Sequence, residues 1–494
     1  MKDLIRIDPS DNVAVAIRAL SAGETVSDGV ETVHVREEVP AGHKICMTAI
    51  PKGASVVKYG RPIGTAAEAI EPGAHVHTQN VKTGLGGVLD YVYRPKLVRL
   101  APRKPESFLG FRRSDGKAGI RNEIWIIPTV GCVNSVAKEI EMRSRAFVHG
   151  SVGGVFAFSH PYGCSQLGGD LDRTRAALCG LIRHPNAGGV LVLGLGCENN
   201  GIESMKKELG SYDENRVRFL NCQDSTDEIA DGVAKIRELC DFAARSEREP
   251  LPASELIVGL KCGGSDGFSG ITANPLVGRF ADRLISEGGT AILSEVPEMF
   301  GAETALMERC ETREVFDKTK DLINGFKEYF LKNGEAVSDN PSPGNKAGGI
   351  TTLEDKSLGC IQKGGHSPVE DVLLYGQPVE KKGLNLLQAP GNDLVSATAE
   401  AVSGAQLILF TTGRGTPFGS PVPTVKISTN TALFQKHGRW IDFNAGDLLE
   451  NASPEEKDDA LFAYVLSLAS GEKETNSERG GYRDFAIFKN GVTL

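Results

Sequence analysis

The chain has 494 residues, of which 40% are hydrophobic and 24% are charged, and its formal net charge is −9. This composition is typical of a soluble globular protein with several domains, and the acidic balance argues against a nucleic-acid-binding protein, which usually has a basic surface. No apolar run approaches the ~20 residues that span a bilayer, and acids and a proline interrupt the stretch where a signal peptide would be apolar. We therefore expect a cytoplasmic protein.

Residues 1–92 are predicted to form a small β-rich domain. Short β-like segments (ETVHV, SVVKYG, HVHTQN) alternate there with Gly- and Pro-containing turns. His43 follows the first of these turns, and His75 and His77 would point to one face of a strand, as a base, a ligand pair or plain surface polarity. Residues 93–107 hold three prolines and five basic residues without periodicity, which predicts an extended linker.

From residue 108 onward the pattern becomes α/β. Apolar runs of strand length alternate with amphipathic segments, which predicts parallel sheets covered by helices on both faces. A charged, proline-containing segment at 243–253 divides this part into domains at 108–245 and 253–494. The predicted strands are residues 124–130, 154–159, 190–195, 217–221, 256–260, 291–296, 384–389 and 406–412.

Thiols and polar groups follow many of these strands, where ligands bind in open parallel sheets. Four cysteines come directly after glycine, namely Cys132, Cys164, Cys197 and Cys360. Because no CxxC pair is present, a small zinc ribbon is not expected. Thiols gathered from distant strand ends would suit iron, as a cluster or as a single Fe²⁺ ion, whereas oxygen ligands from Glu298 or Asp266 would suit Mn²⁺ or Mg²⁺. Three further cysteines in apolar or helical contexts are expected to be buried hydrophobic residues, namely Cys46, Cys179 and Cys240.

Two loops of the C-terminal part offer side chains that could bind an anion. Residues 413–417 (GRGTP) follow a strand, but they lack dinucleotide-loop spacing, and the prolines from Pro417 onward prevent the helix that such a site needs. Arg414 in this loop could instead hold a carboxylate through two hydrogen bonds. The proline-rich loop 340–349 presents Lys346 from a constrained backbone.

The motifs taken together resemble the altronate/galactarate dehydratase family, and the resemblance runs from about residue 5 to residue 494. GHKI, VVKYGRPIG and HVHTQN are similar to the SAF-type β-clip module of these sugar-acid dehydratases. GLGCENN, EVPEMFGAE and the terminal segment resemble the altronate-specific members most. The other motifs are TVGCVN, FSHPYGCSQLG, KCGGSDGFSGITANP, NPSPGNKAGGITTLEDKSLGC, APGND, TTGRGTPFG and FKNGVTL.

The resemblance implies an α/β chain of three parts: a β-clip domain, a second domain used in forming a homodimer, and a C-terminal Rossmann-like domain that carries a metal. It implies an iron-dependent enzyme, usually with Fe²⁺, for which the residues leave Mn²⁺ or an iron–sulfur cluster as alternatives. The implied reaction is loss of water from D-altronate to give 2-dehydro-3-deoxy-D-gluconate. Galactarate or a sulfonated hydroxy acid is the alternative substrate, and a non-enzymatic sensor is disfavoured because no DNA-binding helix pair or basic face is evident.

Removing the C2 proton of a sugar acid needs a cation on the carboxylate, a base near C2 and an acid near the leaving 3-OH. We therefore predict roles for three groups of residues. A subset of four thiols would hold the metal, namely Cys132, Cys164, Cys197 and Cys360, with Glu298 or Asp266 as further ligands. Four side chains are acid/base candidates, namely His43, His77, His160 and Glu298. Three would contact the substrate carboxylate and hydroxyls, namely Asn199, Lys346 and Arg414.

Overall fold

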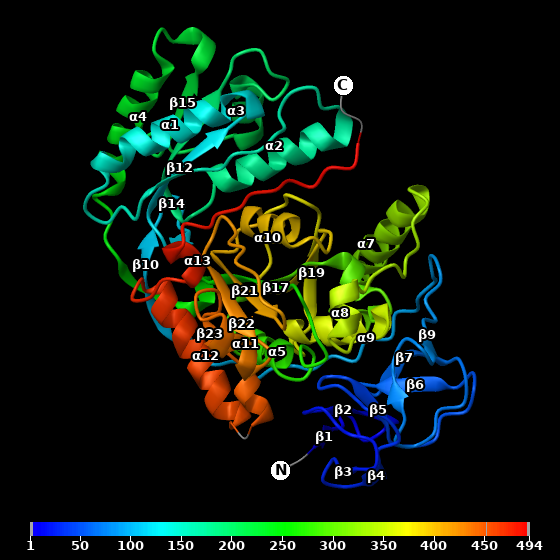
Figure 1. The fold of residues 1–494 in the computed structure, drawn as a ribbon. Coiled ribbons are helices and arrows are strands. Elements are labelled where there is room, and N and C mark those ends of the chain that lie inside the picture. The colour runs from blue at the N-terminus through cyan, green and yellow to red at the C-terminus, as the bar shows by residue number, and fades with distance from the viewer. Residues whose placement is uncertain (1–2, 451, 492–494) are drawn as a thin grey trace.

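The computed structural model describes residues 3–450 and 452–491, so the last three residues of the terminal FKNGVTL motif lie outside the described part. Figure 1 shows three bodies along the chain: a β domain in blue, an α/β domain in cyan and green, and a larger α/β domain in green to red. The predicted fold class is confirmed, because a β module precedes two domains built on parallel sheets. None of the described helices is long and apolar enough to cross a membrane.

The N-terminal domain consists of short antiparallel strands. They form a sheet of order β1-β2-β5-β8, a sheet of order β6-β7-β9 and the hairpin β3-β4. The turn before His43 needs glycine, because Gly42 has a φ of 80° and its position for a Cβ lies 3.2 Å from the carbonyl oxygen of Gly348 in another domain. The strands are β1 (Leu4–Ile5), β2 (Val13–Ala16), β3 (Thr25–Ser27), β4 (Thr32–His34), β5 (Lys44–Cys46), β6 (Ser55–Lys58), β7 (Arg61–Ala66), β8 (His75–Val76) and β9 (Val81–Lys82).

Residues 83–106 form neither helix nor strand and run along the C-terminal domain. The ring of Tyr93 packs on Phe316 with 5.3 Å between centroids, and the backbone N–H of Arg103 donates to the carbonyl of Ser286 at 2.7 Å. This course places the β domain beside α8 (Pro343–Ala347) and α9 (Leu353–Cys360) of the C-terminal domain (Figure 1), because the connecting segment is held against the same body.

The second domain is built on a parallel sheet of order β13-β12-β14-β15. Alternate residues of β12 enter two cores: Ile124 and Ile126 pack with α1 and α4, while Trp125 and Ile127 pack with α2 on the other face. Burial on both faces explains the continuous apolar runs of the sequence. The elements are β10 (Ser107–Arg112), β11 (Ala118–Gly119), β12 (Glu123–Pro128), α1 (Asn134–Ser144), β13 (Val155–Ala157), α2 (Gly168–Ile182), β14 (Ala187–Gly194), α3 (Ile202–Leu209), β15 (Val217–Asn221), α4 (Glu228–Ala243) and β16 (Glu249–Pro252).

The C-terminal domain contains a parallel sheet of order β19-β20-β18-β17-β21-β22-β23. β17 is central and has β18 on one side and β21 on the other, so the chain changes direction in the sheet at this strand. The elements are β17 (Ile257–Cys262), α5 (Ala273–Ser286), β18 (Thr290–Leu293), α6 (Glu303–Met307), α7 (Arg313–Lys332), α8 (Pro343–Ala347), α9 (Leu353–Cys360), β19 (Val369–Leu373), β20 (Gly383–Leu387), α10 (Asp393–Val402), β21 (Leu407–Thr412), β22 (Thr424–Ser428), α11 (Thr431–Lys436), β23 (Phe443–Asn444), α12 (Pro454–Ala469) and α13 (Asn476–Arg479).

After α13 the chain returns to the second domain. The backbone N–H groups of Asn490 and Gly491 donate to the carboxylate of Asp170 near the start of α2, at 3.0 and 2.7 Å. Figure 1 shows this tail in red beside α2. The tail therefore ties the second domain to the C-terminal domain.

Candidate metal centre

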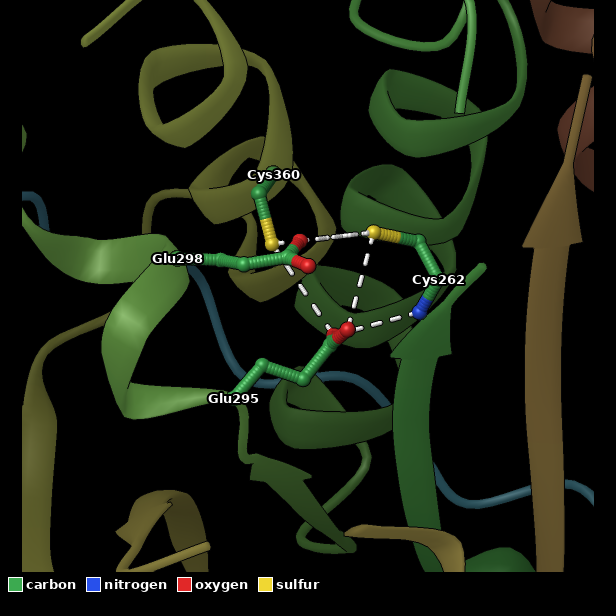
Figure 2. Close-up of side chains that lie close together, drawn as sticks. All are labelled: Cys262, Glu295, Glu298 and Cys360. Carbon is green, nitrogen blue, oxygen red and sulfur yellow. Dashed lines mark hydrogen bonds between the residues drawn. The ribbon is translucent and has the colours of Figure 1, made fainter. Parts of the chain in front are cut away.

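Two thiols and two carboxylates meet at the carboxyl ends of β17 and β18. Cys262 is the last residue of β17, Glu295 and Glu298 lie in the turn after β18, and Cys360 ends α9. All four are buried, and one ligand atom from each lies within 4.8 Å of the others. Figure 2 shows the four side chains pointing toward one another. The centre lies beyond the carboxyl ends of the strands, where open parallel sheets bind ligands.

Glu295 has a left-handed backbone, with φ 67° and ψ 53°, which is uncommon for a residue other than glycine. This turn directs its carboxylate back to β17, where it accepts hydrogen bonds from the backbone N–H of Cys262 at 3.1 Å and from Lys261 Nζ at 2.5 Å. Strained backbone of this kind persists where the surrounding structure fixes it, and it is common at functional sites.

Three buried lysines surround the carboxylates. Lys261 and Lys363 contact Glu295, with Lys363 Nζ 2.9 Å from Oε2, and Lys356 Nζ lies 2.9 Å from Glu298 Oε1. Burial alone would raise the pKa of Glu298, but these ammonium groups outweigh it and lower the pKa to about 2. Glu298 is therefore ionised at neutral pH.

The thiols lie against each other and against the acids. Cys262 Sγ is 3.3 Å from Glu298 Oε2 and 3.8 Å from Cys360 Sγ. The hydrogen bond from Cys262, together with burial, raises the pKa of Cys360 well above its ordinary value. Metal binding would have to displace the thiol protons, and Lys363 Nζ, 2.9 Å from Cys360 Sγ, would stabilise the thiolate that results.

This donor set fits a divalent transition metal. Two sulfur and two carboxylate donors combine the soft and hard ligands that iron accepts, in a dry setting. Lys261 also pairs with Asp393, whose carboxylate lies 2.9 Å from Nζ. With both thiols ionised, five acidic groups therefore face three lysines, and a divalent ion would make the centre neutral.

The β-clip domain contacts the loop that connects α8 to α9. His43 Nε2 lies 3.3 Å from the carbonyl oxygen of Ala347, His43 Nδ1 lies 3.0 Å from His75 Nε2, and His77 Nδ1 lies 3.1 Å from Thr351 Oγ1. The structure therefore places His43 and His77, the two predicted acid/base residues of this domain, beside the segment that leads to Cys360. Burial lowers the pKa values of the three imidazoles, to about 4 for His75 and about 3 for His77, so they are neutral at neutral pH.

Two predicted anion-binding residues lie at the same edge of the C-terminal sheet. Arg414 follows β21 and is exposed, with one guanidinium nitrogen 3.5 Å from the carbonyl oxygen of Gly344 at the start of α8. Lys346 is exposed on the same short helix. Asp266 is buried and accepts hydrogen bonds from Thr429, Ser269 and the N–H of Phe268, so it holds the surrounding loops together and lies outside the four-residue cluster.

The other predicted site residues lie in the second domain, at the carboxyl edge of its own sheet. Cys132, Cys164 and Cys197 are exposed, and Asn199 accepts a hydrogen bond from the N–H of Ser165. In Figure 1 this sheet edge lies near the starts of α1 and α3, far from α9, which carries Cys360. The expected grouping of these thiols with Cys360 is therefore not found, because the strand ends belong to two different sheets.

His160 is buried in the second domain with both ring nitrogens engaged. Nε2 lies 2.8 Å from the carbonyl oxygen of Pro128, and Nδ1 accepts a hydrogen bond from the N–H of Tyr162 at 3.2 Å. These bonds hold the loop after β13, and the ring lies outside the cluster around Cys262, so the acid/base role of His160 stays a prediction.

Several residues of the centre were not among the predicted site residues. Cys262 comes just after the predicted strand 256–260 and Glu295 lies near the end of the predicted strand 291–296, so their strand-end position was the available signal. The lysines at 261, 356 and 363 carried no signal, because charged residues in a sequence do not show which carboxylates they will meet. As predicted, Cys46, Cys179 and Cys240 are buried among apolar side chains.

Comparison with known proteins covers the whole chain. Residues 253–493 match the family model "D-galactarate/Altronate dehydratase, C-terminal", residues 110–244 match the second domain of the same family, and residues 2–84 match its SAF domain. The chain is 52% identical to altronate dehydratase of Bacillus subtilis, with all of both chains covered, and 50% identical to altronate dehydratase of Escherichia coli, with 99% of each covered. It is 34% identical to galactarate dehydratase (L-threo-forming) of Escherichia coli, over 98% of this chain and 96% of that one.

Proposed function

This chain belongs to the altronate/galactarate dehydratase family, and we propose on this premise that it is a hydro-lyase that converts D-altronate to 2-dehydro-3-deoxy-D-gluconate and water. The observation that supports the chemistry is the buried centre of two thiols, two carboxylates and three lysines at the ends of β17 and β18. Two relatives named altronate dehydratase share half or more of its residues, whereas the galactarate dehydratase shares a third.

We assign the metal to Cys262, Cys360, Glu295 and Glu298, and we propose that it is iron as Fe²⁺. Mn²⁺ prefers oxygen ligands, whereas the two thiols favour iron. Bound there, the ion would supply a Lewis acid for the carboxylate and a hydroxyl of the substrate. Lys356 holds the Glu298 carboxylate ionised, and Lys363 would stabilise the Cys360 thiolate once the metal has displaced its proton.

The reaction needs a base, an acid and residues that bind the substrate. The proton on C2 is weakly acidic, so a neutral base must lie within hydrogen-bond reach of it. We propose His43 or His77 for this step, since both lie beside the α8–α9 loop that leads to Cys360. The 3-OH leaves as water after accepting a proton, and the enol that remains tautomerises to the 2-keto acid.

Lys346 and Arg414 are proposed to attract and orient the sugar acid. Both are exposed at the carboxyl edge of the C-terminal sheet, so they are accessible to a substrate approaching from solvent. A guanidinium can hold a carboxylate through two parallel hydrogen bonds, which would fix the end of the substrate next to C2.

The test is turnover of a substrate panel by anaerobically purified protein supplied with Fe²⁺. Formation of a 2-keto acid would be followed with D-altronate, galactarate and (2R)-sulfolactate. We expect D-altronate to have the highest kcat/KM. Preference for either other acid, or absence of product from all three with iron bound, would overturn the assignment.

We also propose that the protein is a homodimer in the cytoplasm, with the second domain in the contact. Met142 and Leu167 of this domain are exposed apolar side chains, at 59% and 50%. Size-exclusion chromatography with light scattering would show twice the 52.7 kDa chain mass. Substitution of both residues by glutamate should shift the mass toward one chain.

A further inference from the structure

We propose that the second domain contains a separate metal site, in which Cys132, Cys164 and Cys197 bind an iron–sulfur cluster. This inference does not depend on the metal centre of the C-terminal domain. The three thiols follow β12, β13 and β14, which are neighbours in the sheet order β13-β12-β14-β15. Because the strands are parallel, their carboxyl ends meet at one edge.

The exposure of these thiols sets them apart from the other cysteines. Among the ten cysteines, six are buried and Cys222 is half-buried, while Cys132, Cys164 and Cys197 are the three that are exposed. Free cysteine is among the most buried residue types, so exposed thiols are unusual even singly. Three exposed thiols at one sheet edge therefore indicate the ligands of a cofactor.

The loops that carry the thiols are packed tightly against one another. Each thiol follows a glycine, and a Cβ on Gly163 would lie 2.0 Å from the carbonyl oxygen of Thr129, in the loop of Cys132. Gly163 and Gly196 have φ angles of 100° and 125°, which residues other than glycine rarely adopt. Glycine at position 163 therefore allows the loop of Cys164 to approach the backbone of the loop of Cys132 closely.

The Glu198–Asn199–Asn200 segment holds these loops in register. Asn199 Oδ1 accepts a hydrogen bond from the backbone N–H of Ser165, the residue after Cys164. The side-chain amide of Asn200 donates to the carbonyl oxygen of Thr129 at 3.2 Å. The N–H of Asn200 also donates to the carbonyl oxygen of Gly163 at 3.0 Å. Polar groups that fix the ligand loops in this way are the usual support of a metal site.

The acid and the imidazole on the same loops are already engaged by the protein. Glu198, the nearest acid in sequence, is committed to Thr129 Oγ1 at 2.5 Å and to the N–H groups of Leu195 and Gly196 at 3.1 and 2.7 Å. His160 is likewise engaged through both ring nitrogens. Thiolates without oxygen or imidazole partners favour iron–sulfur chemistry over Mg²⁺, Mn²⁺ or Ca²⁺.

The spacing of the thiols suits a cluster better than a single ion. In residues 3–450 and 452–491, the one group of three or more His, Cys, Asp and Glu ligand atoms that all lie within 4.8 Å of one another is the Cys262 centre. The three edge thiols therefore do not all lie within that distance of one another, and a cluster of several irons holds its thiolates farther apart than a single ion does. Gln223 Nε2 lies 3.6 Å from Cys197 Sγ, and a hydrogen bond to a ligand sulfur tunes the potential of such clusters.

Three thiolates would leave one iron of a [4Fe–4S] cluster without a protein ligand. Since the thiols are exposed, that iron would face solvent and could take an oxygen ligand from water or from a hydroxy acid. The cofactor is thus a [4Fe–4S] cluster in which one iron has no cysteine ligand.

The test is anaerobic reconstitution of the full chain with Fe²⁺ and sulfide, followed by iron and acid-labile sulfide analysis and Mössbauer spectroscopy. We expect about four sulfides per chain in the wild type. Cys132→Ser, Cys164→Ser and Cys197→Ser should each lose most of this sulfide. Because these positions are exposed, the thermal midpoints of the variants before reconstitution should match that of the cluster-free wild type, which separates cluster loss from misfolding.

Reciprocal variants distinguish this site from the proposed active-site metal. Cys262→Ser and Cys360→Ser should retain the labile sulfide, and Cys222→Ser on the neighbouring strand should retain it too. Absence of labile sulfide in the wild type, a single zinc ion in its place, or sulfide that persists in the three edge variants would overturn the proposal. Loss of turnover in Cys262→Ser with sulfide retained would support both proposals.

Discussion

Lys44 of the β-clip domain and Asp355 of helix α9 are 311 residues apart in the sequence and form a fully buried ion pair, with Nζ 2.8 Å from Oδ2. Lys58 Nζ approaches the other carboxylate oxygen at 3.0 Å. Burial alone would raise the pKa of Asp355, but the two ammonium groups hold it well below its usual range. This pair joins the domain that carries His43 to the helix that ends at Cys360.

Asp355→Asn should therefore destabilise the contact between the two domains. The substitution leaves two buried ammonium groups without a counter-charge, and breaking a buried ion pair costs about 3–5 kcal/mol. We expect a lower unfolding midpoint and faster proteolysis within residues 83–106. Asp317→Asn is the matched control, since it breaks the exposed Arg313–Asp317 pair and should change stability by less than about 1 kcal/mol. Equal effects of the two substitutions would contradict the assignment.

Glu298→Gln should reduce both bound iron and turnover. The substitution removes a ligand charge and leaves Lys356 without its carboxylate partner. We expect iron content well below one per chain at the C-terminal centre and a kcat lower by at least about 100-fold, since such ions supply several kcal/mol. Metal analysis should be done on protein prepared without sulfide.

Glu303→Gln is the control for this variant. Glu303 is a buried acid in a nearby element, paired with Lys327 at 2.6 Å and outside the cluster. It should lower stability without changing the iron content. If Glu298→Gln retained full iron and rate, the ligand assignment would be lost.

Much of the fold was predictable because buried parallel strands are apolar on both faces. Two of the strands that were missed carry charge: β19 includes Glu370 and Asp371, and β22 includes Lys426, which is buried without a hydrogen-bond partner among the described residues. Such residues break the apolar run on which the prediction relies. Only the packing of neighbouring elements reveals these strands.

The site was predictable in part for a related reason. Glu298 and Cys360 were named from their motifs, and both lie in the buried centre. The thiols of the second domain were grouped with Cys360 because all four cysteines directly follow a glycine. A sequence does not show which strand ends share an edge when the chain forms two sheets, so the grouping required the structure.

The histidines of the β-clip domain should make stability fall at acidic pH. Burial is the main cause of the lowered pKa values of His75 and His77, about 4 and 3, against about 6.5 in the unfolded chain. The unfolded state thus binds more protons below about pH 6.5, so stability is present above that pH and is lost as the pH falls toward 4.

Thermal midpoints at about pH 7.5 and about pH 5 would measure this effect. The double variant His75→Gln/His77→Gln should lose less stability on acidification than the wild type. His34→Gln alters an exposed histidine of the same domain and serves as the control. An identical acid-induced loss in the double variant and the wild type would show that these imidazoles do not contribute.

Glu400 should have the opposite pH dependence. It is fully buried, accepts a hydrogen bond from Ser294 Oγ at 2.6 Å, and its second oxygen has no partner in the described part of the chain. Burial, and to a lesser extent the charge of Glu295, raise its pKa to about 8 from an ordinary value of 4.5, so the carboxyl is protonated at neutral pH. An acid with a raised folded pKa stabilises the fold at low pH, and this contribution is lost as the pH rises from about 4.5 to about 8.

Glu400→Gln keeps the shape of the neutral acid and removes its titration. We expect the variant to be close to the wild type near pH 5 and to become progressively more stable than the wild type as the pH rises toward 8. Glu478→Gln gives the contrasting control, because Arg121 lowers the pKa of this buried acid despite the opposing effect of burial. It should be less stable than the wild type at neutral pH, with the difference shrinking on acidification. Thermal midpoints of Glu400→Gln that parallel the wild type across this range would show that Glu400 does not titrate in the window given by its pKa.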